Sequence, residues 1–250
     1  MVNETRCVIN AGFSFSVRNL SLNERILMMV CSELFKRRGR TISTALRLGK
    51  KVSFDNYLRL HREGKRLIRG WFNRAWRNRD CSPENSFEPF IFAWIAFNSW
   101  GMCITGYERD LDIIDALAVN QKLNEDFQEL MGGSKEFREA ARKFHKLWPI
   151  FKVQSIRRKG LYYHFPNWER GEIIEYYLNH DVKDYEPRCW KYHRERGEEV
   201  PLDWAHTLKA IYRVRCNLFH GEKAAHSEMA QKIVSSAFRI LLYMLEKQIP

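Results

Sequence analysis

The residues best suited to chemistry lie near the C-terminal end of the sequence, in the stretch from Ile211 to Lys223. This stretch contains an arginine and a histidine, Arg215 and His220, with Asn217 between them. A guanidinium can hold a phosphate through its planar set of donors, and an imidazole can take up or release a proton near neutral pH. The pair therefore indicates a site that binds a phosphate and transfers a proton.

An amphipathic helix that begins at Leu202 to Asp203 is predicted to carry this stretch, because its apolar residues recur at helical spacing. Arg215 falls in the middle of the apolar stripe, where a charge must be paired or functional. On an ideal helix His220 points about 140° away from Arg215, so the two converge only if the helix loosens or ends, which Gly221 permits. An internal salt bridge for Arg215 and a surface cap for His220 are the alternative. The stripe comprises Leu208, Ile211, Tyr212, Leu218 and Phe219.

The sequence Arg215-Cys-Asn-Leu-Phe-His220-Gly resembles the Arg-x(4–6)-His signature of the HEPN superfamily (higher eukaryotes and prokaryotes nucleotide-binding). The wording Val-Arg-Cys-Asn-Leu-Phe-His-Gly is especially similar to a bacterial branch often called Apea-like. The stretch Trp94-Ile-Ala-Phe-Asn98-Ser-Trp100 is similar to a Trp-Ile-x-Phe-Asn stretch that precedes the signature in such proteins. The resemblance covers these two helices and the final one, and it implies a compact helical bundle.

Many HEPN proteins resemble metal-independent endoribonucleases, often toxins or antiviral effectors, that work at a dimer interface. The resemblance therefore implies RNA as substrate, a homodimer as the working unit, and an antitoxin or another defence-system protein as a further partner. The expected products are a 2′,3′-cyclic phosphate and a 5′-hydroxyl, because the 2′-hydroxyl of RNA can attack its own phosphodiester. The alternatives are a catalytically inactive HEPN module that binds RNA or a partner protein, and a sensor of nucleotides or other small molecules.

The resemblance gives each residue of the signature an expected role. Arg215 would stabilise the transition state, and His220 would act as general acid or base. Asn217 would steer the phosphate or His220, or would only satisfy the fraying end of the helix. Arg213 also has a permitted spacing and points nearly the same way as His220 on an ideal helix, so we expect it, with Lys223, to make supporting contacts to RNA.

The charge of the chain also favours an acidic partner. The formal net charge is +12 and the isoelectric point is near 9.5, which suits nucleic acid first and a membrane surface second. A long helix predicted from Ser53 to about Asn78 carries basic residues along one face, and we expect Arg66 and Arg69 on it to bind RNA phosphates. The alternative is an ordinary solvated helix surface. The basic residues of this face are Arg59, Arg62, Lys65, Arg66, Arg69, Arg74 and Arg77.

An uncharged run from Pro89 to Tyr107 is long enough to raise the question of a membrane helix. Its polar residues and glycines instead favour a buried central helix, from about Phe87 to Thr105, at the centre of a bundle. Asn98 is the one strongly polar group in its interior and must find a partner. It could make a core hydrogen bond, or it could lie beside Arg215 and orient the site.

The chain as a whole predicts an all-α fold, namely a HEPN-like helical bundle with an N-terminal extension and a polar insertion before the signature helix. Residues 1–20 are expected to form an arm, and residues 21–250 the helical domain. The insertion, Asp181 to Pro201, is expected to pack near the site. Further helices are predicted at Ser21–Phe35, Asp110–Met131, Ser134 to before Pro149, Trp168–Asn179 and Ser227–Gln248, with a basic loop or short strand at Phe151–Pro166.

Cofactor motifs are missing from the sequence. It has no phosphate-binding glycine loop, no Ser/His/Asp motif and no HExxH, and carboxylates do not cluster near the signature. We therefore expect chemistry that needs neither a metal nor a cofactor. The six cysteines are scattered without zinc-type spacing, and no apolar signal core opens the chain, so reduced thiols in the cytoplasm are expected.

Overall fold

The computed structural model describes residues 52–158, 170–219 and 227–249 of the chain. The predicted arm at residues 1–20 and the helix expected from Ser21 lie outside the described residues. His220 and Lys223 of the signature stretch also lie outside them, as does Gly221. The part from residue 50 onward forms one compact unit, and it is mostly helical, as the sequence predicts.

Helix α4, Phe87–Thr105, forms the centre of this unit and ends where it was predicted to end. Most of its residues are buried, because helices α3 (Arg62–Trp76), α5 (Asp110–Ala118) and α13 (Glu228–Gln248) pack around it. Gly106 closes the helix in the left-handed conformation, with φ at 67°. Within the helix, Gly101 allows α5 to come close, since a Cβ atom there would lie 2.7 Å from a side-chain carbon of Ile113.

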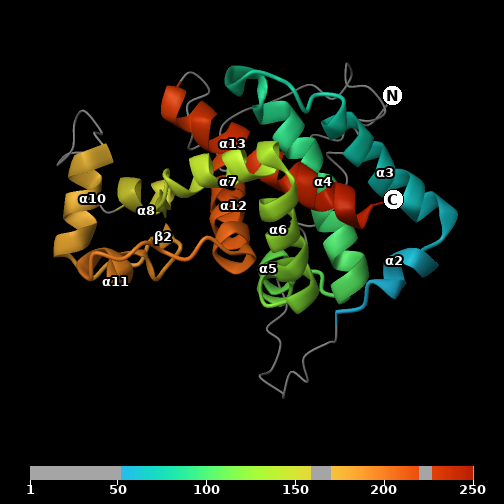
Figure 1. The fold of residues 1–250 in the computed structure, drawn as a ribbon, viewed down its shortest axis with the longest axis horizontal. Helices are drawn as coiled ribbons and strands as arrows, with labels where there is room; N and C mark the ends of the chain where they lie inside the picture. Colours follow the sequence, from blue (N-terminus) through green and yellow to red (C-terminus); the bar gives the residue numbers. More distant parts are fainter. Residues whose placement is uncertain (1–51, 159–169, 220–226, 250) are drawn as a thin grey trace, which may run out of the picture. The chain divides into compact units, whose positions relative to one another are not determined.

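The predicted long helix from Ser53 to Asn78 is in fact two helices, α2 at Asp55–Arg59 and α3 at Arg62–Trp76. The chain turns between them because Leu60 has an extended ψ of 137° and the imidazole of His61 accepts a hydrogen bond from the backbone N–H of Gly64. Ser53, expected as the N-cap, donates its backbone N–H to the carbonyl of Ile104 instead. Helix α3 packs along α4 (Figure 1). A short 3-10 helix, η2 at Pro83–Asn85, joins it to α4.

The predicted acidic helix from Asp110 to Met131 also divides, into α5 at Asp110–Ala118 and α6 at Gln121–Gly133. Asn120 causes the break, because its side chain accepts a hydrogen bond from the backbone N–H of Leu123 and so caps a new helix. Helix α7, Lys135–His145, follows with Ser134 as its N-cap, as predicted. Helix α13, Glu228–Gln248, has Ser227 as its N-cap and ends at Gln248, also as predicted.

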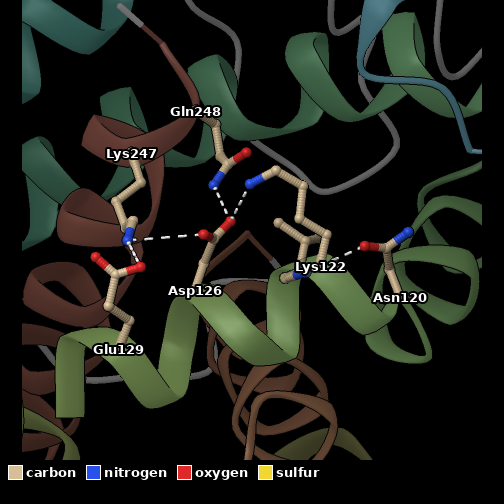
Figure 2. A network of polar contacts seen from close by, with 7 residues as sticks. Asn120, Lys122, Asp126, Glu129, Lys247 and Gln248 are labelled. Carbon is tan, nitrogen blue, oxygen red and sulfur yellow. Dashed lines mark hydrogen bonds and ion pairs between the residues drawn. The ribbon is translucent and has the colours of Figure 1, made fainter. Parts of the chain in front are cut away.

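A polar network ties the last turn of α13 to α6 (Figure 2). The buried carboxylate of Asp126 accepts hydrogen bonds from Lys122 at 2.7 Å and from Gln248 at 2.8 Å. Lys247 lies 2.6 Å from Glu129 and 3.6 Å from Asp126, so it links the two acids. The buried charge of Asp126 is therefore paired by groups from two helices, as a buried carboxylate requires.

The segment between α7 and the signature helix contains more regular structure than predicted. Strand β1, Ile150–Phe151, pairs antiparallel with strand β2, Tyr185–Glu186, so that Ile150 lies opposite Glu186. Residues 153–158, expected as part of a loop or strand, form helix α8 at Val153–Arg158. Helices α10, Arg170–Asn179, and α11, Trp190–Glu195, follow in the described part of this segment, which gathers to one side of helix α12, Trp204–Phe219 (Figure 1).

The all-α prediction is confirmed, because the described ranges are mostly helical and their strands, β1 and β2, are only two residues each. The buried central helix is also confirmed, since α4 is covered by its neighbours. Among the helices of the described ranges, none combines the length and the apolar character that a membrane crossing requires.

Candidate functional site

The signature arginines are carried by helix α12, Trp204–Phe219. Asp203 precedes its first turn, and its carboxylate accepts a hydrogen bond of 2.9 Å from the backbone N–H of His206 and lies 2.9 Å from its imidazole Nδ1. Burial alone would raise the pKa of Asp203, but these contacts with His206 outweigh burial and hold the pKa below its ordinary value. Asp203 thus anchors the start of α12 as an ionised cap.

The buried face of α12 is rotated from the predicted stripe. Val214 is fully buried whereas Phe219 is 42% exposed, so Arg215 lies at the edge of the apolar face and not in its middle. Trp204 fixes the rotation, because its indole N–H donates to the carbonyl of Leu117 at 3.0 Å. The buried residues of the helix are Trp204, Thr207, Leu208, Ala210, Ile211, Val214 and Asn217.

Arg215 is paired with an acid that the sequence did not single out. One of its terminal nitrogens lies 2.8 Å from a carboxylate oxygen of Asp110, the first residue of α5. Its guanidinium carbon also lies 4.6 Å from the ring centre of Phe219 and 5.7 Å from that of Trp94. Both members of the ion pair are about four-fifths buried, with 22% of Arg215 and 18% of Asp110 exposed. The guanidinium is therefore held between an acid and two aromatic rings.

The surroundings of Arg215 are aromatic and partly unsatisfied. Trp94 stacks on Tyr212 with ring centres 5.9 Å apart, and burial raises the pKa of the Tyr212 hydroxyl. The buried Nε of Arg215 and the indole nitrogen of Trp94 have no hydrogen-bond partner in the described part of the chain. The same is true of the side-chain oxygen of Asn98, one turn after Trp94. The expectation that Asn98 orients Arg215 stays a prediction, and Asp110 is the partner that the structure supplies.

Arg213 lies on the other flank of α12. It is two residues from Arg215, so its side chain leaves the helix about 200° away. Its terminal nitrogen lies 4.0 Å from Glu186 of β2, and its buried Nε has no partner within the described ranges. The two arginines of the signature stretch therefore face different parts of the fold.

Asn217 is almost wholly buried and is engaged by the backbone of the preceding segment. Its amide nitrogen donates to the carbonyl of Phe151 at 2.8 Å, and its amide oxygen accepts from the N–H of Val153 at 3.4 Å. Only 1% of the residue is exposed. These contacts attach the end of β1 and the start of α8 to α12, and they favour a positioning role over direct contact with a substrate.

The predicted RNA-binding residues Arg66 and Arg69 are exposed on α3, on a different surface from Arg215. Helix α3 packs on α4 through Trp71, which stacks on Phe92, whereas Arg215 approaches α4 at Trp94. Phe92 and Trp94 point about 160° apart around the helix. The structure therefore does not bring Arg66 and Arg69 together with the signature arginines.

Three residues that contact the signature arginines, Trp94, Asp110 and Glu186, were not predicted as site residues. Trp94 lies in the tryptophan stretch that resembles the family, but Asp110 stands among other acids, Glu108, Asp112 and Asp115, and nothing in the sequence distinguishes it from them. Glu186 lies 27 residues before Arg213, with Asp184 beside it. In the ranges that the structure describes, no group of three or more His, Cys, Asp or Glu side chains could hold a metal ion. Comparison with protein-family models, curated proteins and solved structures finds no match to this chain.

Proposed function

We propose that this chain is a metal-independent endoribonuclease of HEPN type, which cleaves RNA to 2′,3′-cyclic phosphate and 5′-hydroxyl ends and serves as a toxin or antiphage effector. The observation that carries the proposal is the placement of Arg215, held near the end of α12 by Asp110 and two aromatic rings. His220 follows in the sequence Arg215-Cys-Asn-Leu-Phe-His220, which resembles the HEPN signature. Together they supply the cation and the proton carrier that RNA cleavage needs.

The mechanism uses the substrate's own nucleophile. The 2′-oxygen attacks the neighbouring phosphorus and closes the cyclic phosphate, while the bond from phosphorus to the 5′-oxygen breaks. His220 takes the proton of the 2′-hydroxyl or donates the proton that the leaving 5′-oxygen needs. Arg215 stabilises the negative charge that develops on the phosphorus oxygens, through the donors that Asp110 leaves free. DNA lacks the 2′-hydroxyl and should resist cleavage.

Further residues contribute binding and positioning. Arg213 and Lys223 make phosphate contacts close to the site, while Arg66 and Arg69 bind a more distant part of the RNA on α3. We assign Asn217 a positioning role, because both of its polar side-chain atoms face backbone groups of Phe151 and Val153.

The working unit in this proposal is a cytoplasmic homodimer in which two signature helices face each other. Two Arg/His pairs across a two-fold axis form one positive cleft, whereas a single pair offers few contacts to a polyanion. The exposed ring of Phe219 lies beside Arg215 and is available for such a contact. An antitoxin or another defence-system protein would restrain the activity.

A catalytically inactive HEPN module that binds RNA or a partner protein is the second candidate. The observation that favours it is the 2.8 Å contact between Arg215 and Asp110, because the negative charge of an acid at this distance opposes the positive potential that would stabilise the transition state. The two candidates differ in one measurable respect, namely whether RNA is cleaved.

The test is incubation of the purified full chain with a defined single-stranded RNA in EDTA, followed by analysis of the new ends. We expect cleavage to persist and to leave cyclic phosphates, while a DNA strand of the same sequence stays intact. Strict dependence on magnesium would refute the mechanism, and complete absence of cleavage would favour the inactive module.

Matched variants show whether the cleavage comes from this protein or from a contaminating nuclease. His220→Ala should abolish cleavage while the thermal unfolding midpoint is unchanged, and His180→Ala, at an exposed histidine after α10, should cleave like the wild type. Equal cleavage by all three preparations would show that the activity does not belong to His220.

A further inference from the structure

The flank of α12 that faces β2 carries a cluster of cations around one buried acid. The acid is Glu186, whose side chain is 10% exposed. Arg188 lies 3.4 Å and Arg213 lies 4.0 Å from the same carboxylate oxygen, and Lys209 adds a third positive charge nearby. None of these groups takes part in the Arg215 and Asp110 pair.

The pairing within this cluster is loose. Charge-assisted hydrogen bonds between a guanidinium and a carboxylate are normally about 2.7–2.9 Å long, and both contacts to Glu186 are longer. The buried Nε of Arg213 has no partner in the described residues. A guanidinium has five N–H donors, so a single carboxylate oxygen shared at these distances leaves both arginines with donors to spare.

The cluster is also open to a ligand. The side chain of Arg188 is 71% exposed and that of Lys209 is 43% exposed, whereas that of Arg213 is 16% exposed. Lys209 lies 3.7 Å from Asp115, an exposed pair that water screens strongly. Three cations against Glu186 and Asp115 leave an excess positive charge at this point of the surface.

We propose that Arg188, Lys209 and Arg213 form a phosphate-binding subsite on the β2 flank of α12, and that it takes a backbone phosphate of RNA next to the cleaved one. The proposal rests on the proposed function for the identity of the strand. Glu186 is the internal counter-ion of the empty subsite, and an arriving phosphate replaces it as the partner of the two arginines. Burial raises the pKa of Glu186, so its carboxylate takes up a proton more readily when a phosphate displaces it from the arginines.

The geometry suits a neighbouring phosphate and not the reacting one. Arg213 leaves α12 about 200° from Arg215, so one phosphate cannot contact both side chains from the same side of the helix. A strand that crosses the end of α12 can place successive phosphates on the two flanks. The subsite would thereby set the direction in which the strand runs across the helix.

Binding is best measured in the His220→Ala background, where the RNA is not consumed. The probe is a fluorescein-labelled single-stranded RNA of mixed sequence, followed by anisotropy at several salt concentrations. Arg188→Ala removes an exposed side chain, so it should fold normally. We expect it to weaken RNA binding about tenfold near 0.1 M salt and to lower the slope of log K against log salt by about one.

Arg194→Ala is the matched control, because Arg194 is an exposed arginine on α11. It should change affinity little, and Lys209→Ala should resemble Arg188→Ala. Glu186→Gln should bind RNA more tightly than its parent, since the competing charge is gone. The subsite proposal fails if Arg188→Ala and Arg194→Ala have equal affinities, or if the His220→Ala protein binds no RNA.

Cleavage by the wild type separates the two proposals. If the wild type cleaves RNA in EDTA while Arg188→Ala and Arg194→Ala bind alike, the nuclease stands and the subsite is wrong. If the wild type does not cleave but Arg188→Ala alone loses affinity, the subsite stands and the nuclease is wrong. Millimolar inorganic phosphate should compete with RNA for binding to the His220→Ala protein. It should not compete in the double variant that also carries Arg188→Ala.

Discussion

The guanidinium of Arg215 lies 2.8 Å from the carboxylate of Asp110, so the signature helix α12 is tied to the first turn of α5. An acid in the first turn of a helix is also favoured by the helix dipole. Asp110 therefore serves two partners, the N-terminus of α5 and the cation of α12. The arginine is oriented before any substrate arrives, while the negative charge of Asp110 offsets part of the positive potential around it.

Asp110→Asn should lower the free energy of unfolding by roughly 1 kcal/mol, because it removes the charge of a largely buried pair. Combined with Arg215→Ala in a double-mutant cycle, it should show a coupling of about 1 kcal/mol in urea unfolding. Asp115→Asn, at an exposed acid of the same helix, should show no coupling with Arg215→Ala. Additive effects of the Asp110 and Arg215 substitutions would mean that the pair contributes nothing in solution.

Asn217→Ala should destabilise the protein by about 1–3 kcal/mol, because it leaves a buried carbonyl of Phe151 without a donor. Urea unfolding measures this loss, and Asn73→Ala on the exposed face of α3 should stay within about 0.5 kcal/mol of the wild type. At a temperature where it is folded, Asn217→Ala should retain far more cleavage than His220→Ala. A stable but inactive variant would instead assign Asn217 to catalysis.

Asp203→Ala should cost about 1 kcal/mol at pH 7, because α12 loses its N-cap. The folded-state pKa of Asp203 lies below its unfolded value, so its ionic contribution is present above the unfolded pKa, about 3.9, and is lost as pH falls through the folded pKa. The stability difference between wild type and variant should therefore shrink below about pH 4. Unfolding curves from pH 7 to pH 3 test this, and a constant difference would show that the charge is irrelevant.

Sedimentation at micromolar concentration should show a homodimer, as the shared cleft requires. Phe219→Ser should shift the protein towards monomer, because it removes an exposed ring beside Arg215. Leu67→Ser removes an exposed apolar side chain from α3, and it should leave the dimer intact. A wild-type monomer would count against the shared cleft, although a HEPN-like bundle would still be compatible with it.

Helices whose ends are marked by local chemistry could be predicted from the sequence. Helix α4 ends at Gly106 and helix α13 begins at Ser227, and both residues are strong stop or start signals. The breaks after Arg59 and Ala118 were missed, because apolar periodicity continues across them. A capping His61 and a capping Asn120 outweighed that periodicity.

The partners of the site residues could not be predicted, since they are brought together by packing. Arg215 could be predicted to need an acid, but nothing local identifies Asp110 as that acid. The pairing of β1 with β2, which places Glu186 beside Arg213, joins two strands too short to leave a periodic pattern. The rotation of α12 depends on Trp204 and its contact with Leu117, which the spacing of apolar residues does not reveal.

The attachment of the segment before α12 also bears on how freely its sequence can change. Both side-chain hydrogen bonds of Asn217 go to main-chain atoms, the carbonyl of Phe151 and the N–H of Val153, and every residue type other than proline supplies both kinds of atom. These two hydrogen bonds therefore do not depend on the side chain at either position, although the buried ring of Phe151 packs on Tyr177 and belongs to the core. A substitution at Val153 that keeps the backbone N–H would thus leave helix α12 attached to the segment before it, whereas proline there would remove the donor.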